Sequence, residues 1–239
     1  MYNPATDSNP LFQVDFDWNK KPIICINISE MVKQKYKIPM QYETINIGGN
    51  SDDMHFLCRK IDRYLLHIVE EIAEFLKEFN DINTKFPDLK NYTEHKECLM
   101  ELIDVTAYIT SLLSLFYIDL NGLENTKNLE NSFERIFNDE ISSLKNEDVK
   151  NVVNEKLLNI ESILINGIRR NFPERKWHKD TDRILSVKEL YDLYKSCIRE
   201  CTKALYVAVL LFLYLTDMNV DLFTQMFLDK NEEVYSLKK

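Results

Sequence analysis

The stretch HIVEEIAEF, residues 67–75, places three carboxylates inside an apolar helical pattern. Apolar positions recur at helical spacing from about residue 52 to residue 80, so this pattern predicts one long helix. Glu71 and Glu74 are three residues apart, and residues at that spacing share a helix face. Like charges at that spacing repel each other, so a partly buried face that carries them needs a compensating cation.

A second acidic pair lies in the next apolar run, CLMELIDVTAYI, residues 98–109. The pattern predicts a helix from an N-cap at Thr93 to about Tyr117. Two antiparallel helices can bring both acidic pairs into one cluster, and hard divalent cations prefer such oxygen ligands. A single ExxE motif is usually solvated surface, so the prediction depends on the two pairs together. The predicted ligands of Mg²⁺, with Mn²⁺ as an alternative ion, are Glu71, Glu74, Glu101 and Asp104.

Composition narrows the classes of function. The chain has 239 residues, of which 45% are hydrophobic and 29% charged, and it can bury a sizeable core. Its net charge of −9 argues against duplex nucleic acid as a partner, but not against a phosphorylated ligand whose charge metal ions neutralise. Five scattered cysteines without a CxxC motif predict a reduced, cytoplasmic setting, or the host cytoplasm if the source is viral.

No targeting or membrane segment is predicted. The first residues, MYNPATDSNPLFQVDFDW, have neither the basic nor the apolar region of a signal peptide. The longest apolar run, ALYVAVLLFLYL at residues 204–215, is too short to span a bilayer. We therefore expect this run to form a buried core helix.

The remaining pattern predicts an all-α fold in a single domain, residues 1–239. Only four Gly and six Pro occur, which favours long helices. Residues 1–51 are predicted to be an irregular N-terminal segment, in which PIICINI at residues 22–28 can form a short strand.

The second half of the chain predicts more helices. They are expected at about residues 124–145, 147–168 and 186–216, followed by a short turn and a final helix. We expect a helical-bundle core from residues 52–116 and 186–232. Residues 118–185 are then predicted to form an inserted helical lobe.

The acidic motifs resemble a known family. The pattern E-E-x-x-E followed by E-x-x-D resembles the all-α nucleoside triphosphate pyrophosphohydrolases, which include MazG proteins, dimeric dUTPases and phage dCTPase/dUTPases. It reads EEIAE at residues 70–74 and ELID at residues 101–104. The C-terminal stretch LLFLYLTDMNVDLFTQMFLDKNEEVYSLKK resembles dimeric dUTPases in its apolar helix, its turn at Met218-Asn219 and its pair Lys230-Asn231.

The resemblance implies a fold, an activity and residue roles. It implies the helical bundle of the all-α NTP pyrophosphatases, a homodimer, and Mg²⁺-dependent hydrolysis of a deoxynucleoside triphosphate to the monophosphate and pyrophosphate. The first candidate substrate is dUTP. Glu71 would be the catalytic residue that orients or deprotonates the attacking water, and Lys230 and Asn231 would bind phosphate and sugar. No nucleic-acid or membrane partner is implied.

Three other interpretations stay open. The chain can be a dCTPase or a MazG-like house-cleaning NTP pyrophosphohydrolase. It can also be a helical binding protein without activity, because Val234 and Leu237 replace an Asn and an Arg of the family motif. Further candidate site residues are His67 beside the metal ligands, a basic loop at residues 169–179, and as base-reading residues Gln13, Gln34 and Gln41.

Overall fold

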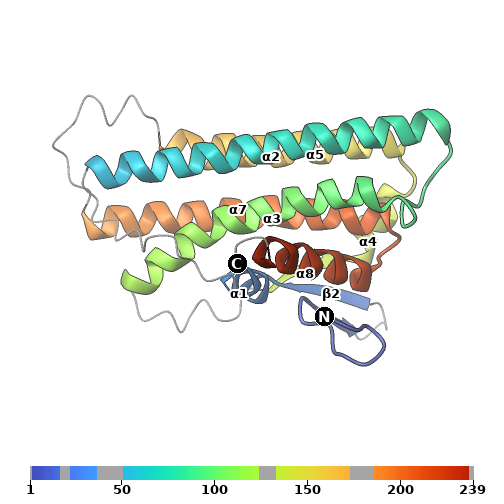
Figure 1. Cartoon of the computed structure of the whole chain (residues 1–239), viewed down its shortest axis with the longest axis horizontal. Helices are drawn as coiled ribbons and strands as arrows, with labels where there is room; N and C mark the ends of the chain where they lie inside the picture. Colours follow the sequence, from blue (N-terminus) through green and yellow to red (C-terminus); the bar gives the residue numbers. More distant parts are fainter. Residues whose placement is uncertain (1, 17–21, 37–50, 124–132, 173–185, 237–239) are drawn as a thin grey trace.

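Long helices lying side by side form the body of the protein (Figure 1). The computed structural model describes residues 2–16, 22–36, 51–123, 133–172 and 186–236. The longest helices in these ranges are α2 (Ser51–Lys85), α3 (Lys96–Leu123), α5 (Val149–Gly167) and α7 (Val187–Leu215). Helix α3 packs between α2 and α7, and α5 packs along α7. The predicted all-α class is confirmed as the main character of the fold.

Local signals set the start and the end of α7. Ser186 and Glu189 form a capping box, in which the Glu189 carboxylate accepts from the Ser186 backbone N–H at 2.9 Å. After α7 the chain reverses through Asp217 and Met218, whose φ angles of 51° and 70° are in the left-handed region. This turn leads into α8 (Val220–Ser236), the predicted final helix.

Aromatic packing and hydrogen bonds fix α8 against the rest of the protein. Phe223 of α8 packs edge-on against Phe12 and Phe212, with ring centroids 5.5 Å and 5.1 Å apart. The side chain of Asn9 accepts from the Thr224 hydroxyl and donates to Asp221, both at 3.0 Å. Helix α8 also packs against α3, so its residues are brought close to the acidic motif on that helix.

A three-stranded antiparallel sheet confirms one prediction and corrects another. Its strands, in the order β1-β2-β3, are β1 (Phe12–Phe16), β2 (Pro22–Asn27) and β3 (Phe133–Phe137). The predicted strand in residues 22–28 is confirmed by β2. The helix predicted at 124–145 is wrong over β3, because β3 pairs with a strand far away in the sequence and such pairing overrides local periodicity.

The N-terminal region is also more regular than predicted. Residues 1–51 were expected to be irregular, but β1, β2 and α1 (Ile28–Tyr36) lie within them. Asn27 begins α1 by accepting from the backbone N–H of Glu30 at 3.0 Å. Met31 and Val32 are buried, so α1 is held by the core as well as by its cap.

Residues 138–171 belong to the bundle and are not an appended lobe. Helix α4 (Asn138–Leu144) contacts α7, and α5 packs along α7 and touches α2. The predicted helix at 147–168 is confirmed by α5, but its place in the fold is not the one expected. A Cβ at Gly167 would lie 2.6 Å from Cγ of Glu200, so glycine permits the close approach of α5 and α7 here.

Helix α3 differs from its prediction in its start. It begins at Lys96 rather than after Thr93, because Asn91 accepts from the backbone N–H and the hydroxyl of Thr93 and holds it in a turn. Among the described residues, Lys96–Phe116 is long and apolar enough to cross a membrane, with 78% of its most apolar window buried inside the fold. Buried core helices pass the same test of length and composition.

Candidate functional site

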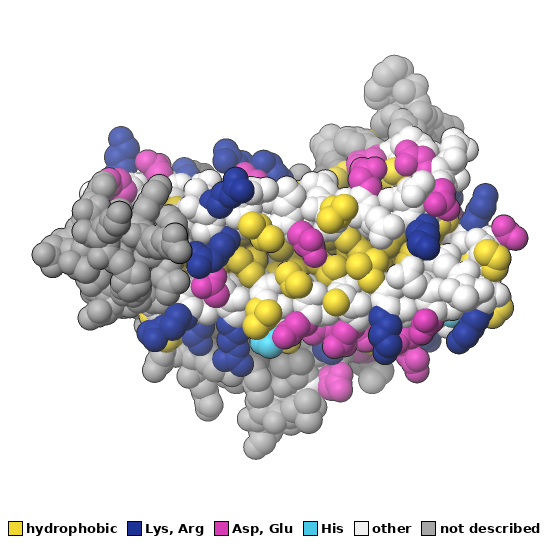
Figure 2. Space-filling model, turned by 90° about the horizontal axis from the view of Figure 1, so that it is seen from above, with side chains coloured by type: hydrophobic (Ala, Val, Ile, Leu, Met, Phe, Trp, Pro, Cys, Tyr) yellow, Lys and Arg dark blue, Asp and Glu magenta, His cyan; other side chains and the backbone are white. Residues whose placement is uncertain are grey.

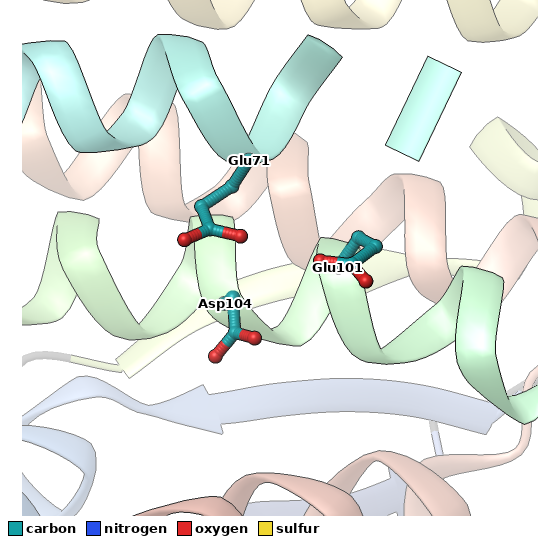
Figure 3. Close-up of side chains that lie close together, drawn as sticks. All are labelled: Glu71, Glu101 and Asp104. Carbon is teal, nitrogen blue, oxygen red and sulfur yellow. The ribbon is translucent and has the colours of Figure 1, made fainter. Parts of the chain in front are cut away.

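Three of the four predicted metal ligands meet between α2 and α3. Glu71 comes from α2, and Glu101 and Asp104 come from α3. Figure 3 shows Glu71 reaching from α2 toward α3, which carries Glu101 and Asp104, and one carboxylate oxygen of each residue lies within 4.8 Å of the others. Asp104 is buried, and the other two are partly buried. The sequence analysis expected these three residues to meet together with Glu74, and the structure brings the three of them together.

The negative charges of the clustered carboxylates raise the pKa of Glu71 and Glu101. Burial raises the pKa of Glu71 to about 7, and the charges of Asp104, Glu101 and Glu74 raise it further in the same direction. Burial also raises the pKa of Glu101, followed by the charges of Asp104 and Glu74. A hydrogen bond between Glu71 and Glu101 raises the pKa of Glu71 and lowers that of Glu101. With a pKa of about 7, Glu71 titrates near neutral pH in the metal-free protein.

Lys230 of α8 reaches the same cluster from the other side of α3. Its ammonium donates to Oδ2 of Asp104 at 2.7 Å, and the Lys230 side chain is partly buried. Burial alone would lower the pKa of Lys230, but the hydrogen bond and the charge of Asp104 outweigh it and raise that pKa. Among the described residues, Lys230 is the cation that the structure places on this group of three carboxylates.

Asn231, the other predicted substrate-binding residue, is buried with an unpaired amide. It is 6% exposed, and neither its Nδ2 nor its Oδ1 has a hydrogen-bond partner among the residues that the structure describes. An unpaired buried polar group costs about 1–3 kcal/mol, and such groups are rare. It follows Lys230 directly in the chain, so an unused donor and acceptor lie next to the residue that contacts the acidic cluster.

Glu74, the fourth predicted metal ligand, lies outside the group of three. Its side chain is exposed on α2. Its charge nevertheless raises the pKa of both Glu71 and Glu101, so it is close enough to act on them. We therefore expect Glu74 at the solvent side of the cluster.

The geometry of the three carboxylates fits a small divalent cation. Two oxygens on opposite sides of Mg²⁺ are about 4.2 Å apart, so small rotations of side chains within a 4.8 Å group suffice to coordinate one ion. Hard oxygen donors are the ligands that Mg²⁺ and Mn²⁺ prefer. A bound cation would also offset the repulsion that raises the pKa of Glu71 and Glu101.

Comparisons with known proteins add no relative. No protein-family model matches the chain, and no curated protein or solved structure matches it.

The candidate residue His67 pairs with Tyr108, an aromatic residue that the sequence analysis did not single out. The ring of His67 stacks on Tyr108, with centroids 5.0 Å apart, and its Nδ1 lies 2.9 Å from Oε2 of Glu70. Burial raises the pKa of Tyr108, and the charges of Glu71 and Asp104 add to this, which places its hydroxyl near the acids. Spacing offered a signal, since His67 precedes Glu71, and Tyr108 follows Asp104, by one helical turn.

Other candidate residues lie elsewhere or make local contacts. Gln13 donates to Asp15, and Gln34 donates to Glu30, so neither is placed at the cluster by its hydrogen bonds. Gln41 and residues 173–185 of the basic loop are outside the described residues. At the start of that loop, Arg169 forms an ion pair with Asp62 of α2 at 2.5 Å. The contact favours a structural role for this part of the loop.

Proposed function

We propose that the protein is a divalent-metal-dependent hydrolase of a deoxynucleoside triphosphate, with dUTP as the first candidate substrate. The observation that carries the proposal is the convergence of Glu71, Glu101 and Asp104 between two helices, with Lys230 beside them. An apolar interface would stabilise the same helices at lower electrostatic cost. The unpaired amide of Asn231 independently favours a ligand at this end of α8.

The proposed reaction releases pyrophosphate and leaves a nucleoside monophosphate. When Mg²⁺ is bound by the carboxylates, it supplies neutralisation of phosphate charge and lowers the pKa of a bound water. The resemblance gives Glu71 the role of orienting or deprotonating the attacking water, and its carboxylate lies within 4.8 Å of the other two acids that would hold the ion. The remaining contribution of the protein is to hold the phosphates in line, since phosphoryl transfer needs little covalent help.

Lys230 and Asn231 bind the substrate in this proposal. The ammonium of Lys230 already neutralises a carboxylate of the cluster, and a phosphate oxygen is an equivalent partner for it. The amide of Asn231 offers both a donor and an acceptor, which suits a sugar hydroxyl or a base edge. The choice of uracil rests on the resemblance to dimeric dUTPases, through the Lys230-Asn231 pair.

A substrate panel tests the proposal. Purified protein is incubated with dUTP, dCTP, dTTP, dATP and the ribonucleotides, with Mg²⁺ or with EDTA, and the products are separated by chromatography. We expect Mg²⁺-dependent formation of dUMP and pyrophosphate, with dUTP turned over faster than dTTP. A preference for dCTP assigns a dCTPase, and equal rates on all four deoxynucleotides assign a MazG-like enzyme. No turnover of any nucleotide overturns the enzymatic proposal.

A further inference from the structure

An apolar strip lies exposed on the face formed by α2 and α5. Six large hydrophobic side chains are exposed among the residues that the structure describes. Four of them lie on this face: Leu66 and Val69 of α2, at 57% and 42%, and Leu158 and Ile165 of α5, at 64% and 45%. Figure 2 shows hydrophobic side chains gathered between the two helices. Aliphatic side chains that gather on one exposed face are a feature of surfaces that bind another molecule.

An ion pair fixes how the two helices face each other along the strip. Arg169, in the turn that follows α5, pairs with Asp62 of α2. Leu66 and Val69 follow Asp62 by four and seven residues, so they share its face of α2. Ile165 precedes Arg169 by four residues and lies on the corresponding side of α5. Helix α2 packs along α3 but touches α5 only locally, so the aliphatic side chains beyond the ion pair stay exposed.

Positive charge gathers at the end of the strip that this ion pair closes. Arg63 and Arg170 directly follow Asp62 and Arg169 in the chain, and both are exposed. Arg59 is exposed one turn before Asp62, on the same face of α2. Figure 2 shows basic side chains around the left end of the strip. Unlike Arg169, the three exposed arginines form no ion pair with another described residue, so their charge is available to a partner.

The charges along the rest of the strip are of mixed sign. Glu70 and Glu74 are exposed on α2, and Lys77 is exposed one turn beyond Glu74. Lys77 also pairs with Glu78 at 3.6 Å. The excess of positive charge is therefore confined to one end of the strip, and a complementary partner carries negative charge at that end.

We propose that the strip binds an amphipathic helix of another protein, with acidic residues at the end that lies over Arg59, Arg63 and Arg170. Two neighbouring helices with exposed aliphatic side chains between them accept a third helix, whose apolar side chains recur every turn. From Arg59 to Ala73, which is also exposed, the basic end and the strip cover about 21 Å of α2, the length of a helix of about 14 residues. Carboxylates at the end of that helix pair with the arginines through charge-assisted hydrogen bonds.

An anionic membrane surface is a poorer match for the strip than a helix. Arginines beside exposed aliphatic side chains also suit such a surface. However, Glu70 and Glu74 are exposed on the same helix, and an anionic surface would repel their carboxylates. A helix that covers the strip alone leaves these carboxylates in water.

The strip is separate from the candidate site. Glu71 faces Glu101 and Asp104 on α3, whereas Leu66 and Val69 face solvent between α2 and α5. The inference therefore does not depend on the proposed function, and the two can fail separately.

A designed peptide tests the surface. The probe is a fluorescent peptide of about 14 residues, with leucines along one helical face and glutamates in its first turn, where they also favour the helix. A second peptide carries lysines in place of the glutamates. Fluorescence anisotropy with the full-length chain should give a micromolar Kd for the acidic peptide and roughly tenfold weaker binding of the basic one. No binding of either peptide, or equal binding of both, overturns the proposal.

Two substitutions locate the binding, each with a control. Leu66→Glu should weaken binding of the acidic peptide roughly tenfold, because it places a charge at the centre of the apolar contact. Val14→Glu, on the similarly exposed Val14 of β1, should leave binding unchanged. Arg63→Glu should weaken binding of the acidic peptide and strengthen that of the basic peptide, whereas Lys150→Glu, the same change of charge near the other end of α5, should do neither. Equal effects of a variant and its control overturn the proposed contact.

Two further measurements separate the other possible occupants of the strip. Sedimentation velocity compares the unmodified chain with Leu66→Glu, and we expect the same oligomeric state for both. A dimer that Leu66→Glu dissociates assigns the strip to a second copy of the chain and overturns the proposal. Vesicles of phosphatidylcholine and phosphatidylserine should not bind the chain. Vesicle binding that Leu66→Glu abolishes assigns the strip to a membrane surface and also overturns the proposal.

Discussion

Helix α3 takes part in two interfaces of opposite character. Toward α7 it is apolar, and Phe116 packs on Tyr194 with ring centroids 5.6 Å apart. Toward α2 and α8 it presents Glu101 and Asp104 to a third carboxylate and a lysine. The first interface stabilises the fold by removing apolar surface from water, and the second costs free energy through partly buried like charges. The contrast favours a ligand as the reason for the second interface.

The largest expected effect is on turnover. Changing Glu101→Gln or Asp104→Asn keeps the side-chain volume and removes one charge from the cluster. We expect Mg²⁺-dependent turnover of the preferred nucleotide to fall by roughly two orders of magnitude or more, as when a charge-stabilising group is lost from a preorganised site. The rate of pyrophosphate release measures the effect.

The matched control for these variants is Asp81→Asn. Asp81 is also an acidic residue on the bundle, but it is exposed near the far end of α2. This variant should keep the rate of the unmodified protein. Near-normal turnover in both Glu101→Gln and Asp104→Asn would remove the metal site from the proposed mechanism.

The second-largest expected effect is on stability, through a change in the apolar interface of α3. Phe116 is fully buried, and changing Phe116→Ala should lower the free energy of unfolding by about 3–5 kcal/mol, through lost burial and the cavity left behind. Phe86 is 52% exposed, so Phe86→Ala serves as the control and should change the free energy by less than about 0.5 kcal/mol. Urea denaturation of both variants measures the difference, and equal losses would contradict the assignment of the core.

The sequence predicted the acidic interface of α3 better than the sheet. Helical periodicity places Glu101 and Asp104 on one face of α3. The prediction that Glu71 meets them rested on the assumption that two successive long helices pack antiparallel. By contrast, β3 is a strand only because it pairs with β2, and no local pattern records that pairing. The aromatic stack of His67 on Tyr108 needed the relative position of two helices, which periodicity alone does not give.

The position of α8 was another feature that the sequence did not predict. The resemblance implied that Lys230 and Asn231 act on the substrate, but it gave no reason for them to be near the carboxylates. That reason is the packing of Phe223 against Phe12 and Phe212, which holds α8 beside α3. For Glu74 the sequence predicted more than the structure shows. Helical spacing places it on the same face as Glu71, but its side chain is exposed and lies outside the group of three.

A moderate effect is expected on metal affinity. Lys230 competes with a cation for Asp104, so Lys230→Gln should bind Mn²⁺ several-fold more tightly in the absence of nucleotide. The same variant should bind nucleotide more weakly, since a charge that faces phosphate is lost. Isothermal titration with Mn²⁺, and separately with a nucleotide, measures both changes. Lys77→Gln, on the exposed Lys77 of α2, is the control. Weaker Mn²⁺ binding by Lys230→Gln would contradict competition between the lysine and the ion.

The smallest effect is on the pH dependence of stability. In the folded, metal-free protein the pKa of Glu71 is about 7, above its ordinary value of 4.5. Between these values the folded state binds a proton that the unfolded state has lost. This contribution to stability is therefore complete below about pH 4.5 and is lost as the pH rises through 7. Because Glu71 is only partly buried, we expect its share of the change in melting temperature to be a few degrees.

Thermal unfolding in EDTA at pH 5, 6, 7 and 8 measures this effect. The melting temperature of the unmodified protein should fall over this range by more than that of Glu71→Gln, which cannot ionise at this position. Asp81→Asn should keep the slope of the unmodified protein. Added Mg²⁺ should raise the melting temperature most at pH 8, where Glu71 is ionised and ready to bind a cation. An unchanged slope in Glu71→Gln would show that the repulsion within the cluster is relieved by solvent, and the contrast between the two interfaces of α3 would then lose its electrostatic basis.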